Sequence, residues 1–150
     1  MAKMLPERPR TFAPGSLEDV MFNALEKLPE DYYIIHSFKL VTVQDGTIFE
    51  SETDFVVFHP EKGIICLEAK AGHVQYLNGE WFYGSGQKMS HDGPYNQASS
   101  NKWKLKDYIQ SSPYNYLLKK CKLLHAVWFP SVSDEELKTR VLPPEADKRF

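Results

Sequence analysis

The sequence has only two cysteines among its 150 residues, Cys66 and Cys121. They are too far apart to form a Cys-x-x-Cys pair, and the five histidines show no zinc-site spacing, so the sequence indicates neither a redox pair nor a zinc centre. The opening residues lack the apolar core of a signal peptide, and no run of about 18 apolar residues occurs. We therefore expect a cytoplasmic protein without a membrane-spanning helix.

An excess of charge of either sign is also missing. Eighteen Lys and Arg stand against twenty Asp and Glu, a formal net charge of -2, so the whole chain indicates neither a basic nucleic-acid binder nor an acidic disordered protein. The length corresponds to one domain, and 42% hydrophobic residues are enough to form a core. Any argument from charge must therefore be local.

The composition along the chain divides it into three parts. Residues 1–15 are polar and rich in proline, and we expect a flexible segment there. Residues 16–131 hold the periodic patterns and form the predicted domain. Residues 132–150 are expected to form a short helix and a linker that leads into a region outside this sequence.

A first helix is predicted from Ser16, which resembles an N-cap with Asp19 as its reciprocal acidic partner, to Leu28. Glu18 lies at the edge of the expected apolar face. The residues of that face share helical spacing and are Leu17, Val20, Met21, Ala24, Leu25 and Leu28.

β-branched and aromatic runs separated by turn residues predict most of the remaining elements. The expected strands cover residues 32–43, 48–58, 64–70, 74–77, 80–83 and 123–129. The strands at 74–77 and 80–83 form a small hairpin that we expect to extend the sheet. A second helix is expected over 95–110, and Ser133 with Glu136 caps a last short helix.

Two acidic residues fall opposite each other if Phe58 pairs with Ile64 across the turn at residues 59–63. That register makes Asp54 and Glu68 direct neighbours, and alternation of side chains puts Lys70 on the same face as Glu68. Like charges in such a pair need a compensating cation, and carboxylate oxygens suit Mg²⁺.

This cluster predicts a metal site for phosphodiester hydrolysis. Asp54 and Glu68 would be ligands, the carbonyl of Ala69 a third ligand, and Lys70 would orient water or stabilise charge on a phosphoryl oxygen. The alternative is that these are ordinary polar residues on a solvated face of the sheet.

The segment Glu52-Thr53-Asp54-Phe55-Val56-Val57, followed by the turn ending in Gly63 and by Ile64 to Gly72, resembles the nuclease-related domain (NERD). NERD is a branch of the restriction-endonuclease-like PD-(D/E)xK nucleases. Gly79-x-Trp81 and Pro94-x-x-Gln97-Ala98 resemble later landmarks of the same domain. The resemblance covers roughly residues 16–131.

The resemblance implies an α/β fold with a restriction-endonuclease-like αβββαβ core, in which helices flank a mixed central sheet. It implies a Mg²⁺-dependent deoxyribonuclease, with Mn²⁺ as a substitute, that acts in DNA processing or repair. Asp54 and Glu68 would hold the metal, Lys70 would position the attacking water, and Glu18 and Gln97 match further residues near the site. Relatives are often fused to helicases, and many dimerise.

The sequence departs from the family pattern at two positions. Thr53 replaces the proline of the nominal motif, and Asn101 stands where some branches carry tyrosine.

A local basic stretch lies between residues 99 and 125, where six lysines stand against one aspartate. Lys102, Lys104 and Lys106 are candidates for contact with a DNA backbone, and a solvated helix face is the alternative. Four aromatic residues interleave with the lysines, and we expect them to pack on the sheet rather than to stack on bases. They are Trp103, Tyr108, Tyr114 and Tyr116.

Other motifs do not support a site of their own. Residues 84–88 lack the ending of a phosphate-binding loop, and Ser90-His91-Asp92 predicts a turn rather than a triad. His36 and His125 are expected in the sheet, and His73 follows Lys70 closely enough to be considered for the site.

Two alternatives to the nuclease stay open. The chain would serve either as a non-catalytic nucleic-acid-binding or docking module of a larger helicase-type protein, or as a hydrolase of small phosphorylated molecules. The sequence also leaves open DNA against RNA, endo- against exonucleolytic cleavage, sequence preference and oligomeric state.

Overall fold

A computed structural model of the chain describes residues 1–9, 11–138 and 142–146. Its centre is a five-stranded sheet in the order β1-β2-β3-β4-β7, and a separate two-stranded sheet holds β5 and β6. The strands are β1 (Lys3–Leu5), β2 (Tyr33–Gln44), β3 (Thr47–His59), β4 (Gly63–Ala69), β5 (Val74–Leu77), β6 (Glu80–Tyr83) and β7 (Leu123–Trp128). The helices are α1 (Glu18–Glu26), α2 (Pro94–Gln110), α3 (Asp134–Lys138) and the 3-10 turns η1 (Asn115–Lys119) and η2 (Pro144–Ala146).

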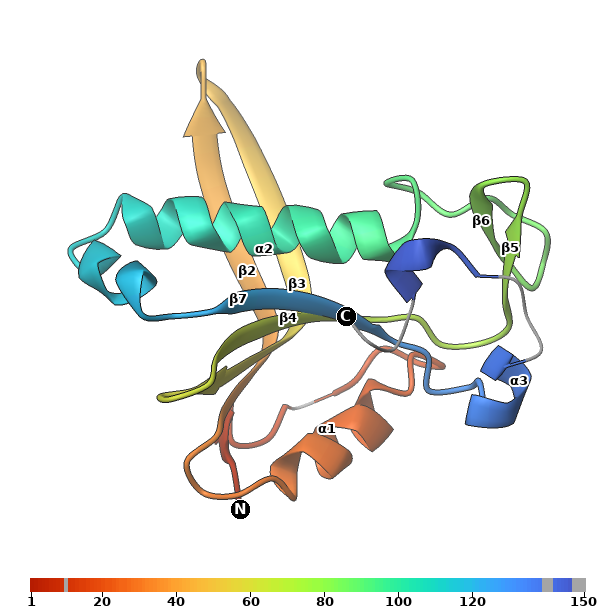
Figure 1. Ribbon diagram of the computed structural model, residues 1–150, viewed down its shortest axis with the longest axis horizontal. Helices are drawn as coiled ribbons and strands as arrows, with labels where there is room; N and C mark the ends of the chain where they lie inside the picture. Colours follow the sequence, from red (N-terminus) through yellow and green to blue (C-terminus); the bar gives the residue numbers. More distant parts are fainter. Residues whose placement is uncertain (10, 139–141, 147–150) are drawn as a thin grey trace.

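The central sheet is mixed, because β1–β2 and β4–β7 are parallel while β2–β3 and β3–β4 are antiparallel. Helices α1 and α2 cover opposite faces of this sheet (Figure 1). After β1, the principal elements follow the expected αβββαβ order. The structure thus confirms the α/β architecture of a restriction-endonuclease-like core. None of the described helices is long and apolar enough to cross a membrane.

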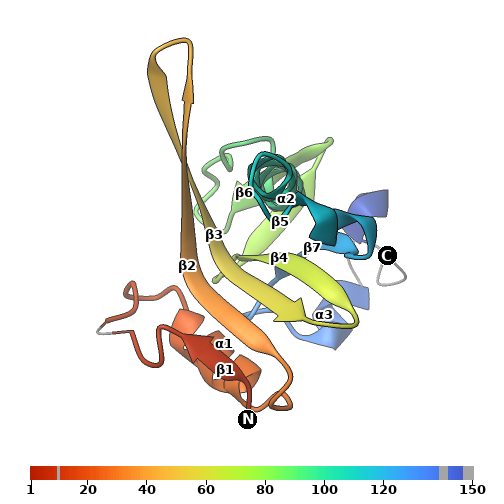
Figure 2. The ribbon, with the colours of Figure 1, turned by 90° about the vertical axis from the view of Figure 1, so that its left-hand side faces the viewer.

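Strands β2 and β3 continue beyond the rest of the sheet as a two-stranded arm (Figures 1 and 2). Asp45 and Gly46 have φ angles of 50° and 75°, which gives the tight two-residue turn expected there. Strand β3 pairs with β4 only from Phe55 to His59, so the earlier part of β3 has β2 as its neighbour. The arm formed by β2 and the first part of β3 therefore separates from β4 at Asp54.

An interruption in β2 lies opposite this divergence. Ser37 has a φ angle of 56° and is missing from the β2–β3 ladder, which resumes at Phe38. Because of this left-handed residue, Ile35 and Phe38 both pack on the α2 side, whereas His36 lies on the α1 side near Phe55. Such irregularities redirect side chains.

Two apolar clusters form on the two faces of the sheet, because successive strand residues point to opposite sides. The α1 cluster contains buried residues of the helix and of the central strands: Met21, Phe22, Leu25, Ile34, Phe55 and Val57, with Ala2 and Met4 of the N-terminal segment. The α2 cluster contains Leu40, Val56, Cys66 and Leu105. A third cluster joins the small hairpin to the end of β7 through Val74, Trp81, Met89 and Phe129.

The structure corrects the prediction for the N-terminal residues. Residues 3–5, expected to be flexible, form β1, which pairs in parallel with β2. Ala2 and Met4 are buried in the α1 cluster. A three-residue strand has no periodicity that the sequence could reveal.

The start of α1 also differs from the prediction. The N-cap is Leu17, in the left-handed conformation with φ 56°, and the helix begins at Glu18. Ser16 Oγ donates to the Ala13 carbonyl and accepts from the Glu18 N–H at 3.3 Å, so it does not form the capping pair with Asp19 that we expected. The cap of α3 by Ser133 and Glu136 is confirmed by both of its reciprocal bonds.

The buried side of α1 is rotated from the expected one. Phe22 is buried, and Val20, assigned to the apolar face, is 53% exposed. Met21, Phe22 and Leu25 continue a stripe that begins at Glu18, in helical spacing. Glu18 therefore points toward the sheet from the first residue of α1. The small hairpin likewise forms its own sheet instead of extending the central one.

Asn101 ties the arm to α2. It is 5% exposed, and its Nδ2 donates to the Glu52 carbonyl at 3.0 Å. Replacing Asn101 by alanine should lower the free energy of unfolding by about 1–2 kcal/mol, because a buried side chain and its hydrogen bond to the Glu52 carbonyl are lost. Urea denaturation measures this change. Asn96→Ala, which removes an exposed bond to the His91 carbonyl, is the control and should cost less; equal losses would contradict the assignment.

Candidate active site

The site begins where the β3–β4 ladder ends. The assumed register is confirmed for the paired residues, from Phe58 with Ile64 to Phe55 with Leu67. Asp54 and Glu68 are the next residues beyond this ladder. They therefore lie at the divergence of the arm from β4.

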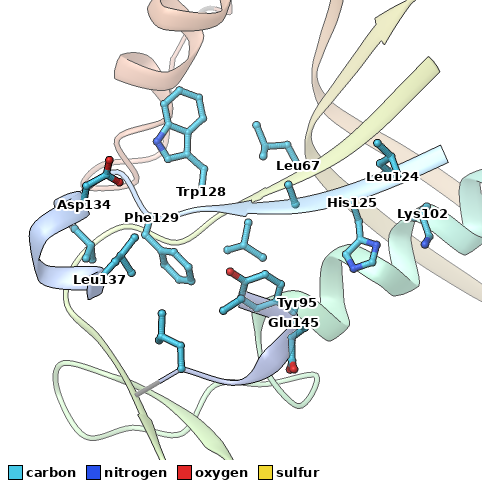
Figure 3. Close-up of a pocket in the computed structure, with 15 residues that line it drawn as sticks. Leu67, Tyr95, Lys102, Leu124, His125, Trp128, Phe129, Asp134, Leu137 and Glu145 are labelled. Atoms are coloured by element: carbon cyan, nitrogen blue, oxygen red, sulfur yellow. The ribbon is translucent and has the colours of Figure 1, made fainter. Parts of the chain in front are cut away.

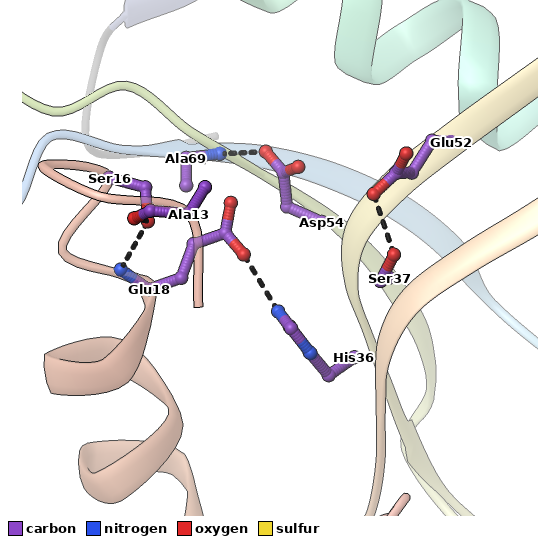
Figure 4. A network of polar contacts seen from close by, with 8 residues as sticks. All are labelled: Ala13, Ser16, Glu18, His36, Ser37, Glu52, Asp54 and Ala69. Atoms are coloured by element: carbon purple, nitrogen blue, oxygen red, sulfur yellow. Dashed lines mark hydrogen bonds and ion pairs between the residues drawn. The ribbon is translucent and has the colours of Figure 1, made fainter. Parts of the chain in front are cut away.

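Asp54 is turned toward the end of β4. Its Oδ2 accepts a hydrogen bond of 2.8 Å from the backbone N–H of Ala69 (Figure 4). Ser37, across from Asp54, donates instead to Glu52 Oε1 at 2.6 Å. The carboxylate of Asp54 is thus held at the β4 end of the site by a backbone donor.

Glu68 is 3% exposed and is only partly satisfied. Its Oε1 pairs with Lys70 Nζ at 3.2 Å, whereas its Oε2 is buried without a hydrogen-bond partner. A buried carboxylate oxygen without a donor is costly and calls for an explanation by an ion or by function.

The charged forms of Asp54 and Glu68 are both disfavoured in the protein. Burial raises the pKa of Asp54 to about 6, and Glu18 adds to the increase by repulsion. Burial raises the pKa of Glu68 to about 7, and repulsion by Asp54 adds to it against the attraction of Lys70. The site therefore holds more negative charge than its own lysine offsets.

Lys70 connects the acids to α2. Its Nζ donates to Gln97 Oε1 at 3.3 Å in addition to its pairing with Glu68, and its side chain is 15% exposed. Gln97 lies in the first turns of α2, which the third apolar cluster fixes through Trp81 and Tyr95. The structure thus brings Gln97, Lys70 and Glu68 together, and Gln97 was expected there only from the resemblance to NERD.

Glu18 reaches the same region from the α1 side. Its Oε2 accepts from His36 Nε2 at 2.7 Å, and Figure 4 shows the Glu18 carboxylate between His36 and Asp54. The site therefore receives Glu18 from one face of the sheet and Glu68, Lys70 and Gln97 from the other, with Asp54 between them. Sequence reasoning missed His36, because only the fold brings β2 next to the first residue of α1.

The donor set fits a hard divalent cation such as Mg²⁺ or Mn²⁺. The partnerless Oε2 of Glu68 and the raised pKa values of Asp54 and Glu68 are what a cation would relieve. Across residues 1–9, 11–138 and 142–146, no group of three or more His, Cys, Asp or Glu converges as a metal site. The fit therefore rests on two carboxylates completed by water, an arrangement that Mg²⁺ commonly adopts.

A comparison with protein-family models matches residues 16–130 to the nuclease-related domain, NERD. This match spans most of the chain, including α1, strands β2 to β7 and α2. The chain belongs to the NERD family. No curated protein and no solved structure matched the chain.

In this NERD domain the three candidate DNA-binding lysines fall on two sides of α2. Lys104 is seven residues after Gln97 and shares its side of the helix. Lys102 and Lys106 lie on the other flank, with their Nζ atoms 4.5 and 5.0 Å from the centre of the Trp103 ring. Of the three, Lys104 is therefore on the side of the candidate active site.

The prediction that four aromatic residues pack on the sheet is wrong. Each is more than half exposed: Trp103, Tyr108, Tyr114 and Tyr116. The reason is that α2 buries only the side carrying Ala98, Asn101 and Leu105. The segment after α2 turns into η1 without burying any of its residues.

The other histidines of this NERD domain lie outside the acidic cluster. His73 is exposed, and its carbonyl accepts from the Gly84 N–H at the base of the small hairpin. His125 lies in β7, as expected, and lines a cavity of about 880 Å³ together with Lys102 and Tyr95 (Figure 3). Burial, with a contribution from Lys102, lowers the pKa of His125. None of Asp54, Glu68 and Lys70 lines that cavity.

Proposed function

We propose that the chain is a metal-dependent nuclease that hydrolyses DNA phosphodiester bonds in DNA processing or repair. The supporting observation is the pair of acids formed by the partly buried Asp54 and the buried Glu68, beside a lysine that pairs with Glu68. Membership of the NERD family supports the same chemistry.

Asp54, Glu68 and the carbonyl of Ala69 are the residues that would hold Mg²⁺ or Mn²⁺, with Glu18 beside them. A bound cation of this kind polarises the scissile phosphate and lowers the pKa of a bound water. Asp54 is restrained for this role by the Ala69 N–H, and Glu68 presents an oxygen with no competing donor.

Lys70 supplies positive charge next to the acids. Its Nζ is held by Glu68 and Gln97, so its position is fixed before substrate binds. In this position the ammonium group orients an attacking water and stabilises negative charge on a phosphoryl oxygen. Gln97 then acts by holding Lys70.

DNA is the proposed partner, with Lys104 as a phosphate contact on the Gln97 side of α2 and Lys102 and Lys106 on the other flank. A homodimer and a fused helicase-type domain stay predictions from the family. We infer a cytoplasmic location from Cys66 and Cys121, which are both free.

The second candidate function is a non-catalytic nucleic-acid-binding module. It is favoured by the exposed aromatic residues of α2 and η1 beside lysines, which suit stacking on unpaired bases. Such a module would bind DNA equally well in EDTA.

Nicking of supercoiled plasmid tests the proposal. Wild-type protein should nick the plasmid in Mg²⁺ or Mn²⁺ and not in EDTA, and Lys70→Ala should reduce nicking at least a hundredfold. The control is Lys88→Ala, since Lys88 also pairs with a glutamate, Glu80, but on the surface. Cleavage that survives Lys70→Ala would contradict the role of Lys70. A shift of DNA in EDTA without any cleavage would instead favour the binding module.

A further inference from the structure

His36 and Glu18 form a buried contact between β2 and the first residue of α1. The Nε2 and Oε2 atoms are 2.7 Å apart, and the two side chains are 8% and 19% exposed. A carboxylate oxygen accepts hydrogen bonds, so Nε2 of His36 carries the hydrogen and donates it. This hydrogen bond holds Oε2 of Glu18 next to His36.

The imidazole ring of His36 is itself fixed by aromatic neighbours. The centres of the Phe12, Phe22 and Phe55 rings lie 5.3, 6.0 and 5.0 Å from its centre. The left-handed residue Ser37 follows and moves the next side chain to the other face of the sheet. His36 is therefore enclosed by three aromatic rings, and its own ring has little freedom to turn.

Glu18 needs a partner such as His36 to keep its side chain in one conformation, with its carboxylate beside the acidic cluster. Its side chain has several rotatable bonds, and the hydrogen bond from His36 Nε2 holds its carboxylate. Glu18 lies close enough to Asp54 to contribute to the raised pKa of that acid. A change in the position of Glu18 would therefore change the electrostatic environment of Asp54, where the cation is proposed to bind.

Resting on the proposed cation site at Asp54 and Glu68, we propose that His36 is a positioning residue for that site. It holds the Glu18 carboxylate toward Asp54 and thereby increases the affinity of the site for a divalent cation. Residues that orient the groups around a metal typically change its affinity by about 10- to 100-fold when they are replaced.

Calorimetric titration with Mn²⁺ tests this role without requiring cleavage. His36→Ala should bind Mn²⁺ at least about tenfold more weakly than wild type. His36→Gln should stay within about threefold, because the amide nitrogen of glutamine can replace Nε2 as the donor to Glu18. Circular dichroism establishes that each variant is folded before titration.

His59 provides a matched control. Its Nε2 lies 2.7 Å from Asp31 Oδ2 and its side chain is 7% exposed, so it repeats the geometry of the His36 pair at the far end of β3. Its Nδ1 accepts the Glu61 N–H, which gives it a structural role. His59→Ala should destabilise the fold without changing the affinity for Mn²⁺.

A double-mutant cycle separates an effect through Glu18 from a general loss of packing. Glu18→Gln alone should weaken Mn²⁺ binding, and adding His36→Ala to it should produce no further loss, because the residue through which His36 acts has already been changed. If the two substitutions weaken Mn²⁺ binding by independent factors that multiply in the double variant, the proposed action of His36 through Glu18 would be overturned.

These outcomes distinguish a failure of the positioning role of His36 from a failure of the proposed cation site. Wild-type Mn²⁺ binding that is lost in Asp54→Asn, together with unchanged binding by folded His36→Ala, would overturn the role of His36 and leave the cation site supported. Wild-type protein that binds no Mn²⁺ would overturn both proposals.

Discussion

Replacing Glu68 by glutamine is expected to abolish cleavage and, at the same time, to stabilise the metal-free protein. The loss of a carboxylate ligand should reduce plasmid nicking by about a thousandfold, because the cation would lose one of its two acidic ligands. The gain in stability follows from the burial of Glu68, which lies beside Asp54 with one oxygen unpartnered. A neutral amide can donate toward Asp54 where a carboxylate repels it.

The size of this stabilisation should depend on pH. In EDTA at pH 8, Glu68→Gln should gain about 2 kcal/mol, a rise in Tm of about 5 °C. At pH 5.5 the difference should shrink, because the pKa of Glu68 is raised to about 7 and the wild-type side chain is then protonated. Glu80→Gln, at an exposed ion pair, should change neither stability nor nicking. A Glu68→Gln variant that melts lower than wild type at pH 8 would contradict this account.

The second large effect is a loss of stability of the metal-free protein as the pH rises. The pKa values of Asp54 and Glu68 are raised to about 6 and about 7 from ordinary values of 3.8 and 4.5. Between the two sets of values the folded state holds protons that the unfolded state has released, so stability falls as pH increases through this window. The decrease from about pH 4 to pH 8 should be on the order of 5 kcal/mol.

Thermal denaturation in EDTA across this pH range measures the effect. The double variant Asp54→Asn, Glu68→Gln should lose most of the slope, because the titrating groups are gone. Mg²⁺ should stabilise wild type more at pH 8 than at pH 5, since it binds the ionised acids. A wild-type profile that rises from pH 4 to pH 8, or one that the double variant leaves unchanged, would contradict the assignment.

The local part of the site could be predicted from the sequence because it lies on one hairpin. The turn length between Phe58 and Ile64 fixes the register, and the register places Asp54 and Glu68 at the same level. Alternation along β4 then brings Lys70 to the side of Glu68. Gln97 needed the family resemblance, since only the fold brings α2 to the end of β4.

The parts that could not be predicted depend on non-local contacts or on unusual backbone conformations. Leu17 as a left-handed N-cap runs against the preference of a bulky residue, and with it the helix begins at Glu18 instead of following a cap at Ser16. Ser37 in the same conformation reverses the faces of β2. The contact of His36 with Glu18 follows from both of these features.

The exposure of the aromatic residues could not be predicted from the sequence for a different reason. Helical spacing indicates that α2 has one buried side, but it does not show how far the sheet extends beneath it. Trp103 and Tyr108 lie on the sides that the sheet leaves uncovered. Their surroundings could only be found from the tertiary structure.

The rate of plasmid nicking as a function of Mg²⁺ concentration, measured for wild type and Asp54→Asn, tests most directly whether Asp54 and Glu68 hold a cation at which DNA is cut. Wild-type nicking should rise to saturation with Mg²⁺ and stop in EDTA, and folded Asp54→Asn should not nick at any of these concentrations. Nicking that persists in EDTA, or an Asp54→Asn curve that coincides with that of wild type, would contradict it.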